Sequence, residues 1–115
     1  MSVVIYHNPR CSKSRQTLQL LQGKGIEPEV VEYLKTPPSK SRLKQILKML
    51  DLKPRELMRR NEDEYKSLGL GDESLTQEQL LGAMVEHPKL IERPIVVNGD
   101  KAALGRPPEK VLEIL

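Results

Sequence analysis

The sequence predicts an α/β domain built on a mixed four-stranded sheet, in the order β-α-β, helical insertion, β-β-α, with helices on both faces. Three observations predict it. Two short β-branched segments, at residues 3–6 and 30–33, flank a segment with helical periodicity. Residues 95–97 and 101–104 have the pattern of a hairpin joined at Asn98-Gly99. Helical patterns fill the chain between these two halves.

The first half is expected to form a β-α-β unit. Residues 3–6 are β-branched or aromatic and too few for a helix, so they predict a buried strand. A helix is expected from about residue 12 to residue 24, because Leu18 and Leu21 lie three apart and share a face. The second strand follows over residues 30–33. Because a helix separates the two strands, they should be parallel, with a right-handed crossover.

A helical insertion is expected at about residues 39–88. Its clearest amphipathic helix carries apolar side chains at i, i+3, i+4 and i+7, which are Leu43, Ile46, Leu47 and Leu50. Thr76 is expected to cap a further helix, with Gln79 as its capping-box partner and His87-Pro88 as its end. The shorter helical segments expected in this region are residues 54–57 and 62–66.

The second half is expected to be a hairpin followed by a closing helix. Asn98-Gly99 favours a type I′ turn, which matches the twist of the flanking strands. The closing helix is expected at residues 109–115. This element order, with a helical insertion between the halves, is that of a thioredoxin-like layout. Because 115 residues is the length of a single domain, the whole chain, residues 1–115, is expected to be one such domain.

Composition excludes several classes of protein. The apolar fraction is 37%, but Phe and Trp are absent, so the core must be aliphatic. No apolar stretch is long enough to cross a bilayer, and residues 1–6 lack the basic region and long apolar run of a signal peptide. With one cysteine no internal disulfide forms, and a reducing cytoplasm is the expected compartment. A net charge of +3 with 3% aromatic residues does not favour a nucleic-acid platform.

Cys11 is the residue most informative about chemistry. It follows the first strand and begins the first helix, and the carboxyl ends of parallel strands are favoured ligand sites. A helix N-terminus offers unpaired N–H groups and partial positive charge, which favour thiolate over thiol and also bind oxyanions. Arg10, Lys13 and Arg15 add positive potential. Ser14 is expected to donate a hydrogen bond to the sulfur.

Two further interpretations of these residues stay open. A lone cysteine is more often a small buried hydrophobe than a nucleophile, although Cys11 has no apolar neighbour in the sequence. No metal is expected, because His87 is the one histidine besides His7 and structural zinc requires four ligands. His7 fits either a loop-positioning role or an acid–base role.

Arginine side chains are the candidate oxyanion ligands, because a guanidinium group presents a planar fork of donors. The candidates are Arg59, Arg60, Arg93 and Arg106. Each alone is an ordinary solvated charge, but Arg93 and Arg106 each precede a proline at a strand boundary. In the thioredoxin-like layout the residue before the third strand faces the helix that carries the cysteine. We therefore expect the Arg93-Pro94 bond to be cis.

The segment from Ile5 to Arg15, Ile-Tyr-His-Asn-Pro-Arg-Cys-Ser-Lys-Ser-Arg, resembles the active-site segment of the ArsC family of glutaredoxin-dependent arsenate reductases. The resemblance covers essentially the whole chain, because further motifs match in the same order. They are Tyr33-Leu34-Lys35-Thr36-Pro37-Pro38, Leu57-Met58-Arg59-Arg60-Asn61, Glu92-Arg93-Pro94-Ile95-Val96-Val97 and Gly105-Arg106-Pro107. Within the family, the Cys-Ser-Lys-Ser loop is most similar to that of the small bacterial YfgD-like members.

The resemblance implies a thioredoxin-like fold and an arsenate reductase that serves arsenic detoxification. It implies that the Cys11 thiolate attacks arsenate while arginines hold the oxyanion. The catalytic residues it implies are Cys11, His7, Ser14 and Arg15, and the substrate-binding residues are Arg59, Arg93 and Arg106. It implies no bound cofactor, with glutathione as co-substrate and glutaredoxin as the reducing partner.

Two alternatives to this enzyme remain. Spx-type regulators share the fold and bind RNA polymerase, and they commonly carry a Cys-x-x-Cys switch at this loop. Position 14 is Ser here, so no internal disulfide switch can form, and an enzyme is favoured over a regulator. Because Cys11 is the one cysteine, the Cys11–arsenic adduct needs an external thiol. A general glutathione-linked thiol oxidoreductase is the other alternative. The expected partners are arsenate or a similar oxyanion, glutathione and glutaredoxin, with no nucleic acid, no membrane and a monomeric chain.

Overall fold

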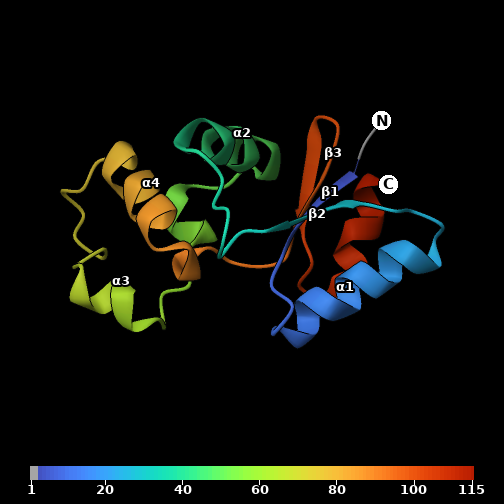
Figure 1. Ribbon diagram of the computed structural model, residues 1–115. Helices are drawn as coiled ribbons and strands as arrows, with labels where there is room; N and C mark the ends of the chain where they lie inside the picture. The colour runs from blue at the N-terminus through green and yellow to red at the C-terminus, as the bar shows by residue number, and fades with distance from the viewer. Residues whose placement is uncertain (1–2) are drawn as a thin grey trace. The chain divides into compact units, whose positions relative to one another are not determined.

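The computed structural model describes residues 3–115, which form two compact units (Figure 1). Unit 1 contains the described residues up to Thr36 together with Arg93–Leu115, and unit 2 is Pro37–Glu92. The helical insertion expected at about residues 39–88 therefore lies within unit 2. The sheet of unit 1 is built from both of its segments.

The four-stranded sheet of unit 1 has the order β2-β1-β3-β4. Its strands are β1 (Val3–His7), β2 (Glu29–Glu32), β3 (Ile95–Asn98) and β4 (Lys101–Leu104). Strand β1 is parallel to β2 and antiparallel to β3, and β3 is antiparallel to β4. The predicted mixed sheet, with one parallel pair and one hairpin, is confirmed. Its central strands β1 and β3 are rich in Val and Ile, which suit a pleated surface covered by other elements.

Unit 1 also contains two helices, α1 (Ser12–Gly23) and η3 (Pro108–Ile114). They lie next to each other against the sheet (Figure 1). The cross-strand partners Ile5 and Val96 share one face, because side chains alternate along a strand. With Leu21 of α1 and Val111 of η3 they form a fully buried cluster. Burial of each such side chain contributes roughly 1.5–3 kcal/mol, so this aliphatic cluster fixes α1 on the sheet.

The hairpin loop is displaced by one residue from the sequence prediction. Asn98 still belongs to the β3–β4 ladder, so the two loop residues are Gly99 and Asp100. Gly99 has a φ of 64°, whereas Asp100 does not have a positive φ. This is the pattern of a type II′ turn, so the predicted type I′ turn is wrong. Asn98 is held in the strand because its Nδ2 group donates to Ile114 O at 2.7 Å.

The last helix, η3, is a 3₁₀ helix at the place where a closing helix was expected. An i→i+3 bond opens it, from Lys110 N–H to Pro107 O at 3.0 Å. Pro108 at its start has no N–H to satisfy, which suits the first turn of a helix. Val111, one turn on, is the residue that this helix buries in the aliphatic cluster.

Gly105, which follows β4, lets two other segments approach closely. A Cβ atom at this position would lie 2.5 Å from Thr17 Oγ1 of α1 and 2.7 Å from Pro94 Cγ. The Gly105 N–H donates to Pro94 O at 3.0 Å. The segments that precede β3 and follow β4 are thereby held against each other and against α1.

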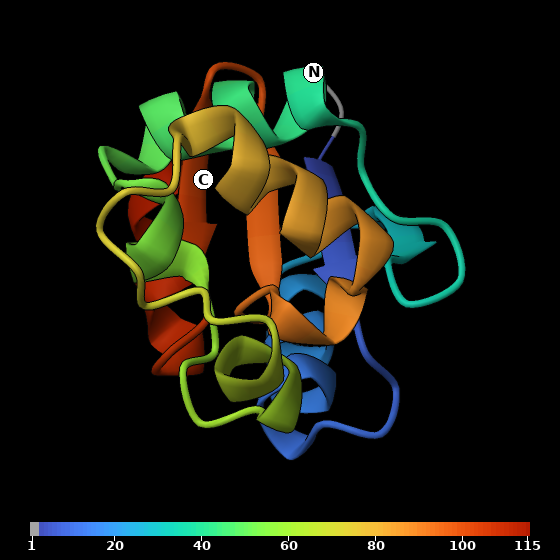
Figure 2. The same ribbon diagram turned by 90° about the vertical axis from the view of Figure 1, so that its left-hand side faces the viewer.

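Unit 2 consists of short helices. They are α2 (Lys40–Leu50), η1 (Pro54–Leu57), α3 (Asp63–Ser67), α4 (Gln77–Glu86) and η2 (Pro88–Leu90). Helices α2 and α4 lie side by side (Figure 2). Thr76 Oγ1 accepts from Gln79 N–H and Gln79 Oε1 accepts from Thr76 N–H, so the predicted capping box is confirmed. Within residues 3–115, no helix is both long and apolar enough to span a membrane.

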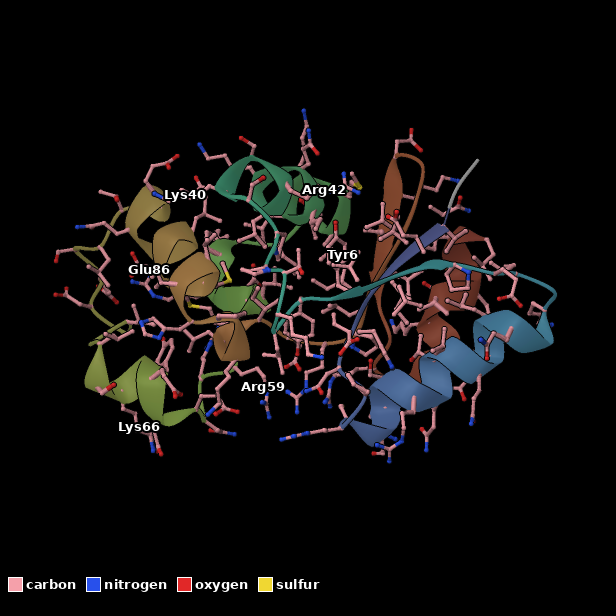
Figure 3. All side chains as sticks on the ribbon, viewed as in Figure 1. Tyr6, Lys40, Arg42, Arg59, Lys66 and Glu86 are labelled. Atoms are coloured by element: carbon pink, nitrogen blue, oxygen red, sulfur yellow. The ribbon has the colours of Figure 1, made fainter. Side chains whose placement is uncertain are left out.

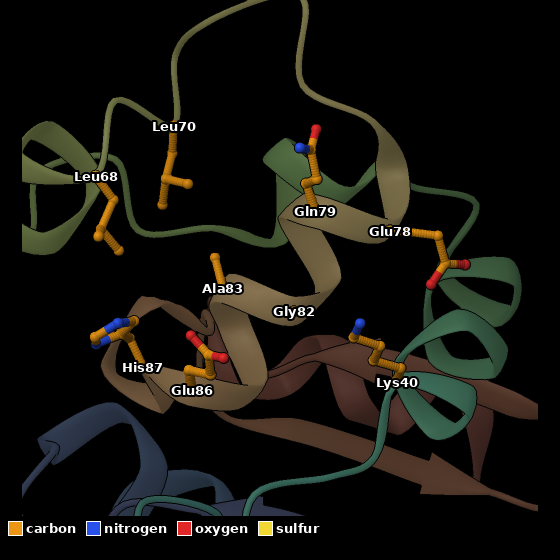
Figure 4. Close-up of a pocket in the computed structure, with 9 residues that line it drawn as sticks. All are labelled: Lys40, Leu68, Leu70, Glu78, Gln79, Gly82, Ala83, Glu86 and His87. Carbon is orange, nitrogen blue, oxygen red and sulfur yellow. The ribbon is translucent and has the colours of Figure 1, made fainter.

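A hollow beside α4 in unit 2 has a mixed lining (Figure 4). Leu68, Leu70 and Ala83 supply apolar side chains, and Lys40 lies across from them. Gly82 leaves room for this lysine, because a Cβ atom there would lie 3.3 Å from Lys40 Cε. The hollow thus belongs to the packing of α2 against α4.

Candidate active site

The topology of unit 1 brings three distant segments to one edge of the sheet. Strand β1 ends at this edge and leads into the loop that carries Cys11. Strand β3 is antiparallel to β1, so it begins there, immediately after Arg93 and Pro94. Strand β4 is antiparallel to β3, so it ends there, shortly before Arg106. Residues far apart in the sequence therefore meet around one sulfur atom.

Cys11 is the N-cap residue of α1. Its backbone is extended (φ −93°, ψ 123°), and its N–H donates to Asn8 O at 3.0 Å. The backbone N–H groups of Lys13 and Ser14 act on the sulfur by lowering its pKa. These are two of the N–H groups that the first turn of a helix leaves without an intrahelical partner. The Cys11 side chain itself makes no cap hydrogen bond to the helix, and the residue is 9% exposed.

Opposing influences set the pKa of Cys11. Burial is the largest single influence, and it raises the pKa because it disfavours the charged thiolate. The Ser14 N–H, the charge of Arg93, the Lys13 N–H and a hydrogen bond from Arg93 all lower the pKa. Together they outweigh burial, so the pKa of Cys11 lies below the ordinary value for a thiol. The sulfur is therefore biased toward the nucleophilic thiolate.

Arg93 and Arg106 are linked to each other as well as to the sulfur. Arg106 Nε donates to Arg93 O at 2.8 Å, and Arg106 Nη2 lies 4.0 Å from Cys11 Sγ. The predicted cis bond between Arg93 and Pro94 is confirmed, and the Arg106-Pro107 bond is also cis, which was not predicted. Two guanidinium groups and a helix N-terminus thus converge on one thiolate.

His7 and Ser14 form a buried pair beneath the loop. His7 Nδ1 lies 2.6 Å from Ser14 Oγ, which also accepts from Asn8 N–H at 3.0 Å. Burial is the main influence that lowers the pKa of His7, Arg15 lowers it further, and Glu32 partly opposes them. These surroundings favour the uncharged form of His7. The hydroxyl of Ser14 bonds within this pair, whereas its backbone N–H lowers the pKa of Cys11.

Residues 6–114 match the model of the ArsC family. The chain belongs to the ArsC family. It is 60% identical over 114 residues to Uncharacterized protein YfgD of Escherichia coli strain K12, with 98% of this chain and 96% of that protein covered. It is 55% identical over 116 residues to Arsenate reductase of Haemophilus influenzae, with full coverage of both. A solved structure titled Arsenate reductase from Vibrio cholerae is similar, with TM-score 0.97, 59% identity, and 100% and 98% of the two chains covered.

The fold of this ArsC chain is thioredoxin-like, as the element order predicted, and the site lies where β1 passes into α1. Of the predicted site residues, Ser14, Arg93 and Arg106 act directly on the sulfur. His7 lies beneath the loop, bonded to Ser14 Oγ. Arg15 acts at the loop, where its Nη1 donates to Pro9 O at 2.9 Å. Within the described residues 3–115, no group of three or more His, Cys, Asp or Glu residues is arranged to hold a metal.

Asn8 is a site residue that the sequence analysis missed. Its N–H donates to Ser14 Oγ, its Oδ1 accepts from Arg10 N–H at 3.0 Å, and its carbonyl accepts from Cys11 N–H. An asparagine side chain that bonds to the backbone two residues on is a known turn signal, so Asn8-Pro9 carried a hint of this role. In this ArsC chain Asn8 holds the loop in the form that presents Cys11.

Arg59 lies in unit 2, in the segment between η1 and α3 (Figure 3). Its N–H donates to Leu90 O at 2.7 Å, and its Nη1 forms an ion pair with Glu62. The backbone around Arg59 is thus fixed by the bridge between Met58 and Ile91. Its role as an oxyanion ligand stays a prediction from the family resemblance.

Proposed function

We propose that this protein is an arsenate reductase in which the Cys11 thiolate attacks arsenate and an external thiol completes the reaction. The observation that carries the proposal is the convergence of Arg93, Arg106 and two backbone N–H groups on one sulfur whose pKa is lowered. Relatives of 55% and 59% identity that carry the name arsenate reductase support it. The reducing cytoplasm is the compartment in which such a thiol-dependent enzyme works.

In the proposed first step, Cys11 Sγ attacks the arsenic atom of arsenate. The S–As bond forms, and one hydroxyl group leaves arsenic as water after it takes up a proton. Arsenic stays pentavalent in this step. Arg93 and Arg106 hold the anion and stabilise the charge that develops on its oxygens, because preorganised cationic donors act strongly in a partly desolvated site.

In the proposed second step, a glutathione thiolate attacks Cys11 Sγ. A disulfide forms between the two sulfurs, the electron pair of the S–As bond passes to arsenic, and arsenite leaves with trivalent arsenic. Two thiolates are oxidised to one disulfide while arsenic gains two electrons. The external thiol is required because Cys11 is the one cysteine of the chain. Glutaredoxin then removes the glutathione group and regenerates the Cys11 thiolate.

Turnover of arsenate to arsenite tests this proposal. Purified protein is assayed with glutathione alone, with glutathione and glutaredoxin, and without thiol, beside the Cys11→Ser variant. We expect arsenite only in the presence of thiol and none from Cys11→Ser. Lack of arsenite from the wild type with both thiols, or equal turnover by Cys11→Ser, rejects the proposal.

A glutathione-linked thiol oxidoreductase is the second candidate. The lowered pKa of Cys11 in a thioredoxin-like fold favours it, because such a thiolate attacks disulfides as well as oxyanions. Reduction of a mixed disulfide between glutathione and a small thiol, measured without arsenate, separates the two candidates. If the protein reduces the mixed disulfide faster than it reduces arsenate, each at saturating substrate, arsenate is the secondary substrate.

A further inference from the structure

Two exposed cationic side chains lie next to Cys11 and do not contact its sulfur in the interactions described above. Arg10 and Lys13 flank Cys11, and both side chains are exposed. Among the ion pairs of the described residues 3–115, none involves either of them. Arg15 differs, because its guanidinium donates to Pro9 O and closes the loop. The charges of Arg10 and Lys13 are therefore directed to solvent.

The backbone holds both residues close to the sulfur. The Lys13 N–H acts on Cys11 by lowering its pKa, and the Arg10 N–H is held by Asn8 Oδ1 at 3.0 Å. Their main chains are therefore fixed beside Cys11 while their long side chains reach outward. The Debye length at physiological salt is about 8–10 Å, so both charges act on an anion that approaches the sulfur.

The surrounding sequence does not neutralise these charges. Residues 7–26 contain four cationic side chains and no Asp or Glu. On the neighbouring strand, Glu32 faces the site edge but is paired with Lys35 at 3.6 Å. Asp100 lies in the hairpin loop, at the other end of the sheet from Cys11. The approach to the sulfur in unit 1 is thus positive.

We propose that Arg10 and Lys13 form a cationic rim that speeds the approach of the carboxylate-bearing thiol donor to Cys11. The inference rests on the proposed function, which requires an external thiol. Cys11 is only 9% exposed, which favours a small thiol at close range, and two separate cations complement two carboxylates on one small molecule. Arginine and lysine at such a rim act mainly on the rate of encounter.

Alkylation of Cys11 by a charged and an uncharged reagent tests the rim without arsenate. Iodoacetate is an anion and iodoacetamide is neutral, and both react with the thiolate. The ratio of their rate constants therefore cancels any change in the thiolate fraction or in the nucleophilicity of the sulfur. For Arg10→Gln/Lys13→Gln we expect this ratio to fall about three- to tenfold at low salt, with the difference lost in high salt.

Lys24→Gln is the matched control. Lys24 is the C-cap of α1, at the opposite end of the helix from Cys11, so the same loss of charge there should leave the ratio unchanged. The proposal of a cationic rim is wrong if the ratio of the iodoacetate and iodoacetamide rate constants is unchanged in the double variant, or if it falls equally in Lys24→Gln.

Two disulfides of opposite charge test which donor the rim recruits. Oxidised glutathione carries carboxylates and cystamine carries ammonium groups, and each forms a mixed disulfide with Cys11 while releasing one thiolate. In the double variant we expect the rate with oxidised glutathione to fall and the rate with cystamine to stay equal or rise. If both rates are unchanged and only deglutathionylation by glutaredoxin slows, the rim docks an acidic protein, and the proposal of a small donor is wrong.

These measurements separate the two proposals. If the protein does not reduce arsenate but the double variant reacts more slowly with the anionic reagents alone, the cationic rim stands and arsenate is rejected as the substrate. If the protein reduces arsenate but the ratio of the two alkylation rate constants is the same in the double variant, the proposed function stands and the cationic rim is rejected.

Discussion

At the scale of single residues, the ionisation of Cys11 depends on opposing influences that one substitution can separate. Arg93 lowers the pKa of Cys11 through its charge and through a hydrogen bond, against the effect of burial. We expect Arg93→Gln to raise this pKa, because the thiolate loses its cation while the sulfur stays buried. The pH dependence of iodoacetamide alkylation measures it.

Lys101→Gln is the control for Arg93, since Lys101 starts β4 at the far end of the sheet. Equal alkylation profiles for Arg93→Gln and the wild type would show that Arg93 does not set the ionisation of Cys11. Arg93→Gln should also weaken arsenate binding, because loss of a charge-assisted contact commonly costs about 1.5–3 kcal/mol.

His7 links the site to the pH dependence of stability. Burial lowers the pKa of His7 below its ordinary value of 6.5, so the unfolded chain binds this proton more readily than the folded chain does. Stability then falls as the pH drops below about 6.5 toward the folded-state pKa of His7. We expect the loss of urea stability between pH 7 and pH 5 to be smaller in His7→Gln than in the wild type. His87→Gln, which changes the other histidine, should keep the wild-type loss; if it alone flattens the profile, His7 is not the responsible group.

At the scale of elements, Gly105 limits how β4 meets α1. An added Cβ would lie 2.5 Å from Thr17 Oγ1 and 2.7 Å from Pro94 Cγ. We expect Gly105→Ala to destabilise the fold by about 1–3 kcal/mol, the usual cost of an overpacked contact. Gly23→Ala is the control, because a Cβ there has nothing within 4 Å. Chemical denaturation of both variants measures this loss of stability. Equal unfolding midpoints for Gly105→Ala and Gly23→Ala would contradict the close approach at Gly105.

The elements that the sequence predicted correctly have local causes. The β-branched run of β1, the leucine spacing of α2 and the Thr76–Gln79 capping box are all contained in a few neighbouring residues. The hairpin loop was misplaced for a non-local reason, since Asn98 is held in β3 by a bond to Ile114 at the end of the chain. The bond from Asn8 N–H to Ser14 Oγ depends likewise on the position of α1, and periodicity does not contain that information.

At the scale of the whole molecule, the site is assembled by topology. The strand order and directions explain why Cys11, Arg93 and Arg106 lie at one end of the sheet of unit 1. The sequence predicted the element order along the chain and one mixed sheet, but not the order of the strands within it. The link from Arg106 Nε to Arg93 O and the placement of backbone N–H groups on the sulfur needed coordinates. The role of Arg59 was given by family resemblance, because this residue lies in the other unit.

Arg59 therefore provides the test of whether unit 2 contributes to the reaction. Its neighbour Arg60 has the same charge, and its Nε donates to Arg55 O at 3.4 Å, so Arg60→Gln is the matched control. If Arg59 holds arsenate, we expect Arg59→Gln to lower kcat/KM for arsenate roughly ten- to hundredfold, the effect of losing one charge-assisted contact. The alkylation rate of Cys11 by iodoacetamide should stay unchanged, since the change acts on the substrate. Glu62→Gln, which removes the ion-pair partner of Arg59, reports any purely structural effect on unit 2. Equal losses in Arg59→Gln and Glu62→Gln, with matching falls in urea stability, would make Arg59 a structural residue and leave the oxyanion to the arginines of unit 1.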